Sequence, residues 1–189
     1  MPDRDQTHQR HTRRAALAVV GASLASALTH PATSAQEATP TALPNALAEW
    51  IAGWQSLDPD RIAASYAEDA VHEVVATGQA ITGREAIRAN IAALMAAIPD
   101  TVLTVNQAFA AGEAGAIDWH YAGHYTNPYP GFPPPGGQAL SFRAATLFEL
   151  ADGLVVRTSE FYDLYGLLVQ MGLLPPPGGA MPSEATPVP

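Results

Sequence analysis

Four long strand-like segments fill the second half of the chain and constrain its fold more than any other feature. They cover residues 101–109, 116–126, 138–150 and 154–163, and each is bounded by turn-forming residues. Asp152-Gly153, between the last two, marks the tightest hairpin. Strands joined in this way predict an antiparallel sheet, and one face of that sheet must be covered by another layer.

Helical patterns in the first half supply that layer. Leu47, Trp50 and Trp54 recur at helical spacing, and Gly53 interrupts this pattern without breaking it. A second helix is expected from Asp58-Pro59 to about residue 67, because an N-cap acid precedes a proline at the first helical position.

A third helix is expected between a turn at its start and Pro99-Asp100 at its end. Thr82 and Glu85 have capping-box spacing, which places its start there. A short strand at 70–75 precedes it, and a last helical segment covers 164–171. We therefore predict an α+β fold in which a curved, mostly antiparallel sheet wraps around three N-terminal helices. A curved sheet leaves a concavity, where a small ligand binds by default.

The ends of the chain differ in composition from this domain. Residues 1–35 have the form of an export signal, with four arginines before a short apolar segment at 15–28 and small residues at 33–35. Arg13-Arg14 resembles a twin-arginine signal. We expect a linker at 36–43, the domain at 44–173 and a proline-rich tail at 174–189, with the protein exported to the periplasm or beyond the cell.

Charge and cysteine content exclude several functions. Past residue 35 the chain has five arginines, no lysine and 16 acidic residues, a formal charge of −11. Nucleic-acid binding is not expected, since it depends mainly on cationic groups that neutralise phosphates. The absence of cysteine excludes disulfides and thiolate metal sites, and no membrane span is expected in the mature chain.

Several motifs together resemble the SnoaL-like polyketide cyclase or ester cyclase family of the nuclear-transport-factor-2-like superfamily. The motifs, in chain order, are DAVH at 69–72, GRE at 83–85, WHYAGHYT at 119–126, GFPPPG at 131–136, FELADG at 148–153 and SEFYDLYGLLVQMG at 159–172. The resemblance covers about residues 46–172. It implies a cone-shaped fold with a pocket between sheet and helices, and commonly a homodimer packed through the outer sheet face.

The same resemblance implies a reaction. Characterised cyclases of this family close a ring by intramolecular aldol condensation, without metal or cofactor, using a carboxylic acid in the pocket. Such an acid removes a proton next to a carbonyl group, and burial suits it because desolvation raises a carboxyl pKa toward neutrality.

Glu160 is the first candidate for this acid, since it lies where the family has the acid of its last strand. On a regular strand Glu160 shares a face with Thr158 and Tyr162, whereas Asp163 lies on the opposite face, so only one of the two acids points inward. Asp163 is a second catalytic candidate or the N-cap of the last helix. For Glu160, the alternatives to catalysis are a ligand-orienting role and a solvated position.

Three histidines are further candidates, because imidazole titrates near neutrality and can share a proton with a carboxyl. His124 is a candidate for that relay, and His72 and His120 are candidates for substrate binding. Asp118, His120 and His124 alternate on one strand face and invite a metal interpretation, but one strand supplies at most three donors and the family needs no metal. We therefore expect no metal and no cofactor.

Aromatic residues are expected to form the core or the pocket wall. These substrate-binding candidates are Trp50, Trp54, Trp119, Tyr121, Tyr125 and Phe161. Arg143 lies within a strand among apolar residues, so it either faces solvent or pairs with an acid such as Glu149 or Glu160. The loop at 127–137 contains five prolines and three glycines and is expected to be a stiff lid or rim.

Three functions remain open at this point. The first is a cofactor-independent enzyme that acts on an apolar small molecule with a carbonyl group. The second is a module of the same fold that binds such a ligand without catalysis, because a fold does not determine a function. The third is hydrolysis or isomerisation of the kind seen in related epoxide hydrolases and ketosteroid isomerases, which mostly require two or three cooperating polar groups.

Overall fold

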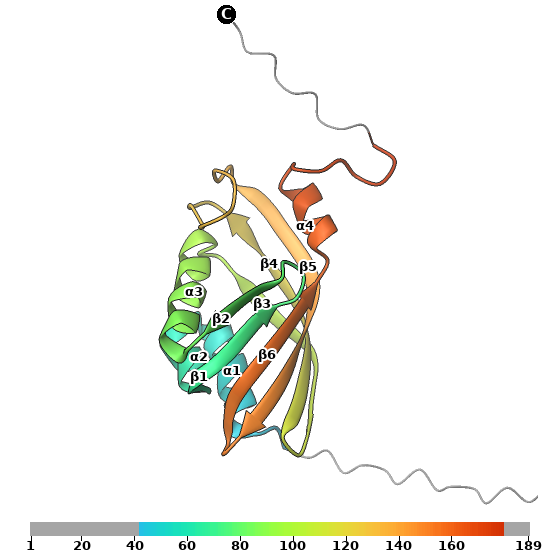
Figure 1. Cartoon of the computed structure of the whole chain (residues 1–189). Coiled ribbons are helices and arrows are strands. Elements are labelled where there is room, and N and C mark those ends of the chain that lie inside the picture. The colour runs from blue at the N-terminus through green and yellow to red at the C-terminus, as the bar shows by residue number, and fades with distance from the viewer. Residues whose placement is uncertain (1–41, 180–189) are drawn as a thin grey trace, which may run out of the picture. The chain divides into compact units, whose positions relative to one another are not determined.

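The computed structural model describes residues 42–179, which contain four helices and six strands (Figure 1). The helices are α1 (Asn45–Ser56), α2 (Pro59–Ala64), α3 (Arg84–Ala97) and α4 (Leu164–Gln170). The strands are β1 (Tyr66–Val74), β2 (Gln79–Thr82), β3 (Val102–Ala111), β4 (Ala114–Tyr125), β5 (Gln138–Ala151) and β6 (Leu154–Tyr162). The α+β class predicted from the sequence is confirmed.

The six strands form one curved sheet in the order β2-β1-β6-β5-β4-β3. Strands β3 to β6 follow one another as antiparallel neighbours, as their turn-bounded patterns predict. Strand β1 lies parallel to β6, which places His72 beside Thr158 and Val74 beside Glu160. This parallel pairing joins the two halves of the chain within the sheet.

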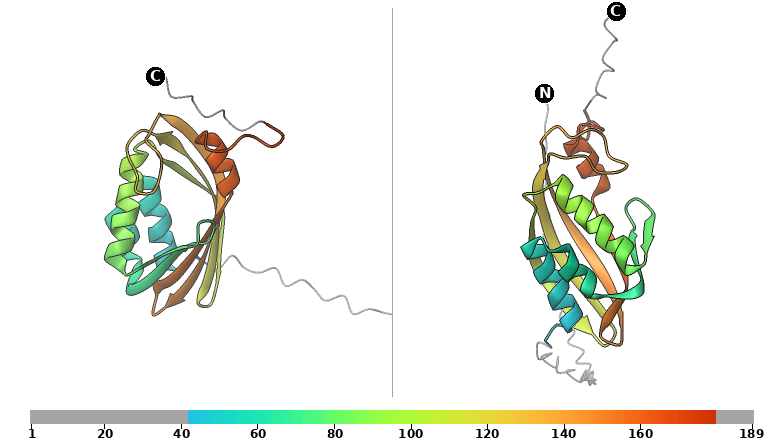
Figure 2. Two further views of the ribbon diagram at one scale, coloured as in Figure 1. Left: turned by 45° about the horizontal axis from the view of Figure 1, so that its top comes forward. Right: turned by 90° about the vertical axis from the view of Figure 1, so that its left-hand side faces the viewer.

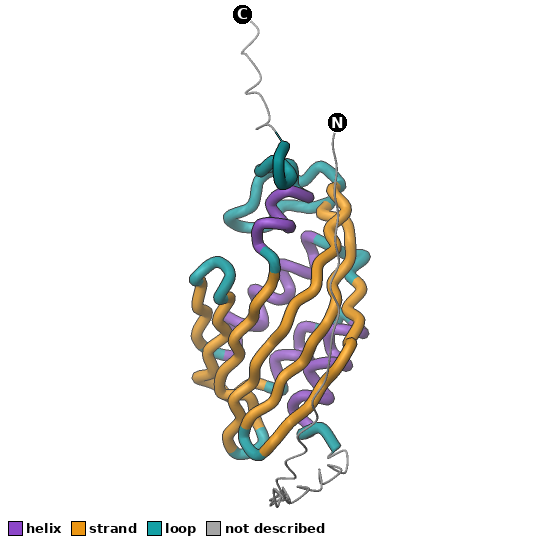
Figure 3. Tube along the Cα trace, turned by 90° about the vertical axis from the view of Figure 1, so that its right-hand side faces the viewer, coloured by secondary structure: helices purple, strands orange, loops and turns teal. Residues whose placement is uncertain are grey.

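Helices α1, α2 and α3 all lie on one side of the sheet and cover that face (Figure 2). The core lies between these helices and the sheet and contains Trp50, Tyr66, Ile87, Trp119 and Phe148, each at most 3% exposed. Figure 3 views the opposite face of the sheet, with these helices behind the strands. The short helix α4 follows β6 and is fixed to β5, because the Gln170 side chain bonds the backbone of Ser141 in both directions.

The junction between α1 and α2 forms as the sequence predicts. The Asp58 side chain accepts a hydrogen bond from the Arg61 backbone N–H (3.0 Å), and Pro59 begins the helix. The two helices approach closely at Gly53, where an added Cβ would lie 2.5 Å from Ile62 Cγ1. This glycine is therefore a packing requirement as well as an interruption of the helical pattern.

The start of α3 differs from the prediction. The N-cap is Gly83, with a φ of 95°, and no side chain caps the helix, so Thr82 and Glu85 do not form the expected capping box. Thr82 instead ends β2, which pairs with Val71 of β1 and was not predicted. A four-residue edge strand contains too few residues for its alternation to stand out in the sequence.

The expected export signal lies outside the described residues, as do residues 36–41 of the linker and residues 180–189 of the tail. Between residues 42 and 179, no helix combines the length and the hydropathy that crossing a bilayer requires.

Candidate active site

A pocket lies between the inner face of the sheet and helices α1 and α3. Its wall is mainly aromatic and aliphatic and includes Trp50, Trp54, Trp119, Tyr121, Phe142 and Tyr162, together with Ile91 and Leu94 of α3 and Ile98, the residue that follows this helix. Tyr121 stacks on Phe142 with ring centroids 5.2 Å apart. Polar residues also line the pocket, among them His72, Gln79, Asn90 and Glu160. An apolar cavity with a few polar groups is the usual form of a small-molecule site.

Glu160 is the acid of this pocket. It lies near the end of β6, on the inward face that it shares with Thr158 and Tyr162. Among the described residues, no side chain donates a hydrogen bond to its carboxyl, and burial raises its pKa to about 7. At neutral pH the carboxyl therefore holds a proton about half of the time, which suits an acid–base group.

Tyrosine hydroxyls surround Glu160 and remain protonated. Burial, with a smaller contribution from the negative charge of Glu160, raises the pKa of Tyr121 and of Tyr162 to about 12. Tyr121 is already bonded to Thr101 Oγ1 (2.7 Å), which fixes its ring in the wall. These hydroxyls thus act as neutral groups throughout the range in which Glu160 titrates.

His72 lies on β1 and pairs with Thr158, two residues before Glu160 on β6. Its Nδ1 is 2.8 Å from Thr158 Oγ1, and desolvation lowers its pKa to about 4. The imidazole is therefore neutral at pH 7, so His72 cannot serve there as a cationic partner for the Glu160 carboxylate.

The three tryptophans of the pocket differ in their hydrogen bonds. Trp50 Nε1 donates to the Tyr66 hydroxyl (3.2 Å), and Trp119 Nε1 donates to Thr146 Oγ1 (2.9 Å). Trp54 Nε1 is the only buried side-chain nitrogen or oxygen without a partner in the part of the chain that the structure describes. A buried donor without a partner is costly, so Trp54 Nε1 is an unfavourable feature of this wall.

The loop between β4 and β5 borders the pocket through Tyr129 and Phe132. Tyr125 anchors this loop, since its hydroxyl donates to Pro133 O (2.8 Å) and accepts from Tyr129 N–H (3.2 Å). The Tyr129 hydroxyl donates to Asn90 Oδ1 of α3 (2.7 Å), which ties the loop to the helix. Tyr125 itself is not a lining residue, so it supports the pocket from behind.

Two candidates on or after β6 lie away from the pocket. Asp163 is the N-cap of α4 and accepts from Gly166 N–H (2.9 Å), which is the alternative that the sequence left open. Phe161 is 42% exposed on the outer face of the sheet, because it alternates with Glu160 along the strand. The structure thus brings Glu160 into the cavity, but not Phe161 or Asp163.

The histidines of β4 also lie on the outer face, away from Glu160. His124 Nδ1 contacts Asp100 Oδ2 (2.6 Å), and His120 Nε2 contacts Ser141 Oγ (3.0 Å). The structure therefore does not place His124 in a relay with Glu160, or His120 in the pocket. The reason is strand alternation, since Trp119 and Tyr121 on the same strand point inward.

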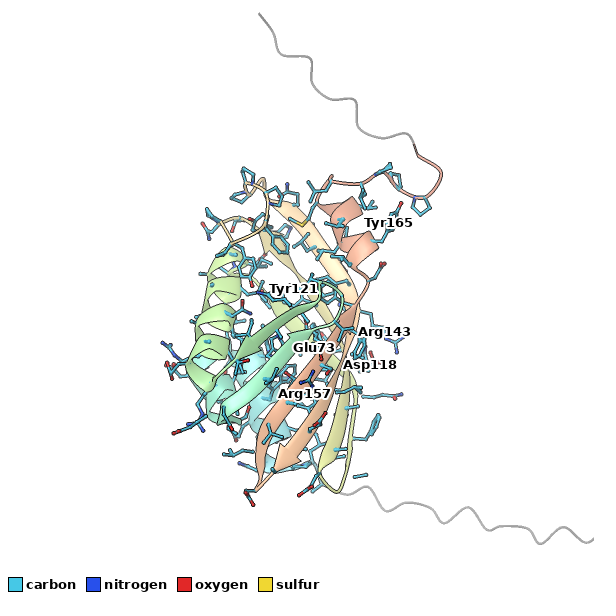
Figure 4. The ribbon with its side chains drawn as sticks, viewed as in Figure 1. Glu73, Asp118, Tyr121, Arg143, Arg157 and Tyr165 are labelled. Atoms are coloured by element: carbon cyan, nitrogen blue, oxygen red, sulfur yellow. The ribbon has the colours of Figure 1, made fainter. Side chains whose placement is uncertain are left out.

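Arg143 forms an ion pair that the sequence did not identify. It contacts Asp118, with Nε 2.7 Å from Oδ1, rather than Glu149 or Glu160. Figure 4 shows this pair on the side of the sheet away from the helices, whereas Tyr121 lies on the helix side. The Arg143 guanidinium lowers the pKa of Asp118 and leaves the pKa of Glu160 untouched.

The sequence analysis missed several pocket residues, among them Asn90, Tyr129 and Tyr162. Asn90 lies on α3 among small residues and offers no distinguishing pattern, and Tyr129 lies in the proline-rich loop. Tyr162 shares the strand face of Glu160 and could have been found by that alternation. Among residues 42–179, no three histidine or acidic side chains converge as a metal site.

The sequence pattern of a SnoaL-like domain matches residues 47–158, which is more than half of the chain. No curated protein is significantly similar in sequence.

Solved structures share the fold. A protein of ketosteroid isomerase-like fold from Catenulispora acidiphila, in complex with trimethylamine, is 27% identical with a TM-score of 0.57, over 77% of this chain and 100% of that one. A protein named as a SnoaL-like polyketide cyclase from Jannaschia sp. CCS1 is 22% identical with a TM-score of 0.61, over 73% and 99%. AclR from Streptomyces galilaeus, named as a hydroxylase, is 23% identical with a TM-score of 0.60, over 70% and 85%.

The activities in these names differ, so the structural likeness establishes an architecture rather than a reaction. The domain match and the shared cone-shaped architecture together show that the chain belongs to the SnoaL-like family of the nuclear-transport-factor-2-like superfamily.

Proposed function

We propose that this protein is a cofactor-independent enzyme of the cyclase or isomerase type, in which Glu160 transfers protons on an apolar small molecule with a carbonyl group. The observation that carries the proposal is the Glu160 carboxyl, which lies in an aromatic pocket with its pKa raised to about 7. A carboxyl with this pKa is ionised often enough to take a proton at neutral pH and basic enough to hold it.

The proposed reaction begins at the carbon next to the carbonyl group. The Glu160 carboxylate takes a proton from this carbon, and the electron pair of the C–H bond moves to form an enolate. In a ring closure, the enolate carbon then bonds to a second carbonyl carbon of the same molecule. The resulting alkoxide takes the proton back from Glu160, so no oxidant or reductant is consumed.

The composition of the pocket supports an uncharged substrate. Its lining residues include no lysine or arginine, so a carboxylate or phosphate on the ligand would find no cationic partner there. A neutral, largely apolar ketone or ester fits this lining.

We also propose that the protein works outside the cytoplasm, on the basis of the signal-like residues 1–35. A dedicated biosynthetic cyclase ordinarily works beside cytoplasmic enzymes, whereas an exported protein meets its substrate beyond the membrane. N-terminal sequencing of the protein from periplasmic and cytoplasmic extracts tests this proposal. We expect periplasmic protein that is cleaved near residue 35. Protein that stays in the cytoplasm with Met1 intact would contradict the proposal.

Glu160→Gln tests the proposed reaction. The full-length protein is incubated in D₂O with a panel of apolar diketones, and deuterium incorporation next to the carbonyl group and ring closure are followed by NMR. We expect Glu160→Gln to reduce both by at least about 100-fold while it retains ligand binding, since general acid–base catalysis contributes about 10²–10⁴-fold.

Glu149→Gln is the matched control, because Glu149 is an exposed glutamate on the outward face of β5. It should leave exchange unchanged. Equal exchange in the wild type and Glu160→Gln would disprove the role of Glu160. Tight binding of a diketone by the wild type with no exchange or ring closure would instead favour the non-catalytic binding module.

A further inference from the structure

Four side chains form a continuous series of polar contacts from α1 to the pocket. Trp50 Nε1 lies 3.2 Å from the Tyr66 hydroxyl, this hydroxyl lies 3.4 Å from Thr158 Oγ1, and Thr158 Oγ1 lies 2.8 Å from His72 Nδ1. The first three residues are at most 2% exposed, so water cannot easily replace any of these contacts. We call Trp50, Tyr66, Thr158 and His72 the Trp50–His72 chain.

The direction of the hydrogen bonds follows from the chemistry of the first residue. An indole nitrogen only donates, so the Tyr66 oxygen accepts from Trp50. The Tyr66 hydrogen then has Thr158 Oγ1 as its remaining partner among the described residues. The Thr158 hydroxyl, which accepts from Tyr66, has its own hydrogen free for His72 Nδ1.

The opposite direction leaves a buried hydrogen without an acceptor. If Nδ1 carried the imidazole proton and donated it to Thr158, the Thr158 hydroxyl could donate only to the Tyr66 oxygen. The Tyr66 hydrogen, at a residue that is 1% exposed, would then have no acceptor among the described residues. Buried polar groups without partners are rare because each one destabilises the folded state. The arrangement therefore favours an unprotonated Nδ1, and a neutral imidazole then carries its proton on Nε2.

We propose that the Trp50–His72 chain holds His72 in the Nε2–H tautomer, so that His72 presents a fixed hydrogen-bond donor to an acceptor oxygen of the pocket ligand. His72 lines the pocket, and its Nδ1 is occupied by Thr158, so Nε2 is the nitrogen that a ligand can reach. Desolvation, which lowers the His72 pKa to about 4, keeps the ring neutral in this state.

The position of this donor specifies a feature of the substrate. His72 pairs with Thr158 across the parallel strands, two residues before Glu160 on β6, and both ionisable groups line the same cavity. The pocket thus places one neutral N–H donor near one acid. This arrangement matches a carbonyl oxygen with an acidic C–H close to it, a conclusion that rests on the proposed function of Glu160.

In this assignment His72 binds the ligand oxygen, and Trp50, Tyr66 and Thr158 are positioning residues. His72 is then an electrophilic donor for the developing oxyanion rather than the base of a proton relay. A donor that needs no reorientation during the reaction stabilises the oxyanion more than a freely rotating one.

The tautomer is measured directly by ¹⁵N NMR of the histidine ring nitrogens in the full-length, ¹⁵N-labelled protein at pH 7.5, without substrate. His72→Gln identifies the His72 signals by their loss. We expect a pyrrole-type signal for Nε2 and a pyridine-type signal for Nδ1. The Nδ1–H tautomer or a doubly protonated ring in the wild type would overturn the proposal.

Variants of the chain test whether it sets the tautomer. Thr158→Val keeps the shape and removes the hydroxyl, and it should lose the Nε2–H preference, whereas Thr158→Ser should retain it. Tyr66→Phe removes the donor to Thr158 and should give a mixture of tautomers, which provides a second test if Thr158→Val does not fold. An unchanged His72 tautomer in folded Thr158→Val and Tyr66→Phe would show that the chain does not set it.

Ligand binding tests the donor role. With a diketone that binds the wild type, His72→Gln should weaken binding at least about 10-fold, and the His72 Nε2–H signal should shift on titration. An unshifted signal with a bound diketone would refute the donor role. Because the tautomer is measured without substrate, inactivity of Glu160 would remove the proposed reaction and leave the tautomer result standing.

Discussion

Glu160 affects stability as well as chemistry, because its pKa is raised from 4.5 to about 7 by burial. Between these values the folded state binds more protons than the unfolded state, so the free energy of unfolding falls as pH rises through this window. The shift corresponds to about 3 kcal/mol at most, at 1.36 kcal/mol per unit of pKa. The acid that the proposed reaction needs therefore destabilises the fold at neutral pH.

We expect Glu160→Gln to remove this pH dependence. Relative to the wild type, the variant should gain about 2–3 kcal/mol in free energy of unfolding between pH 5 and pH 8, because glutamine has no charge to desolvate. Urea denaturation at both pH values measures the gain. His72, with its pKa lowered to about 4, makes wild-type stability rise from pH 4 to 6.5, and this opposite effect cancels when both proteins retain His72.

Glu149→Gln serves again as the control and should follow the wild type at both pH values, because Glu149 is exposed. A Glu160→Gln variant that parallels the wild type from pH 5 to pH 8 would mean that the carboxyl remains solvated in the folded protein.

The sequence predicts some of these residue positions and not others. Strand alternation is enough to separate Glu160 from Asp163 and Phe161, and it also groups Asp118, His120 and His124 on one face. Alternation does not say which face is inward. The contact of His72 with Thr158 spans 86 residues and depends on the register of two parallel strands, which no local pattern records.

At the scale of the elements, Gly53 shows how packing overrides local propensity. Alanine would favour the helix by up to about 1 kcal/mol relative to glycine. A Cβ at this position, however, would lie 2.9 Å from the backbone nitrogen of Ile62 and 3.2 Å from Asp58 O. The backbone of α2 cannot move away without disturbing the Asp58 cap and the buried Ile62.

We predict that Gly53→Ala lowers the free energy of unfolding by about 1–3 kcal/mol, the usual cost of overpacking, despite its better helix propensity. Thermal and urea denaturation measure the change. Gln55→Ala, at an exposed position of the same helix, changes propensity without packing and should stay within about 0.5 kcal/mol of the wild type. A Gly53→Ala protein as stable as Gln55→Ala would show that α1 and α2 can separate freely.

The start or end of an element was predictable where all the local sequence signals favour the same structure. Asp58-Pro59 starts α2 as expected, since a cap acid and a first-turn proline favour the same structure. Thr82 has two competing roles, as a helix cap and as the last residue of a strand, and pairing with Val71 of β1 prevails. The pattern of a local cap cannot reveal this outcome because the partner strand decides it.

At the scale of the whole molecule, the order of helices before strands predicts the α+β class. It does not explain why the sheet face away from the helices exposes large apolar side chains. Phe109, Leu147 and Phe161 are 62%, 49% and 42% exposed there. The strand register places Phe109 beside Ala116, and Ala116 beside Leu147. Phe161 lies beside Ala145, two residues from Leu147 along β5. Phe109, Leu147 and Phe161 therefore form one apolar patch. Exposed apolar patches of this kind commonly mark interfaces between proteins.

We expect this apolar patch to be the contact surface of a homodimer, in agreement with the association implied by the family resemblance. In a twofold dimer each substitution enters the interface twice. Leu147→Asp should therefore weaken association at least about 100-fold, equivalent to about 2.7 kcal/mol, because it buries two unpaired carboxylates. Sedimentation equilibrium over a range of protein concentrations measures the dissociation constant.

Leu173→Asp provides the control, since Leu173 is 43% exposed but lies beyond α4, away from the sheet face. It should leave the dimer intact. The pocket opens on the opposite side of the sheet, so both variants should keep the wild-type affinity for a diketone. Two results would rule out this face as the interface. One is a wild type that stays monomeric at high concentration, and the other is a Leu147→Asp variant that dimerises as strongly as Leu173→Asp.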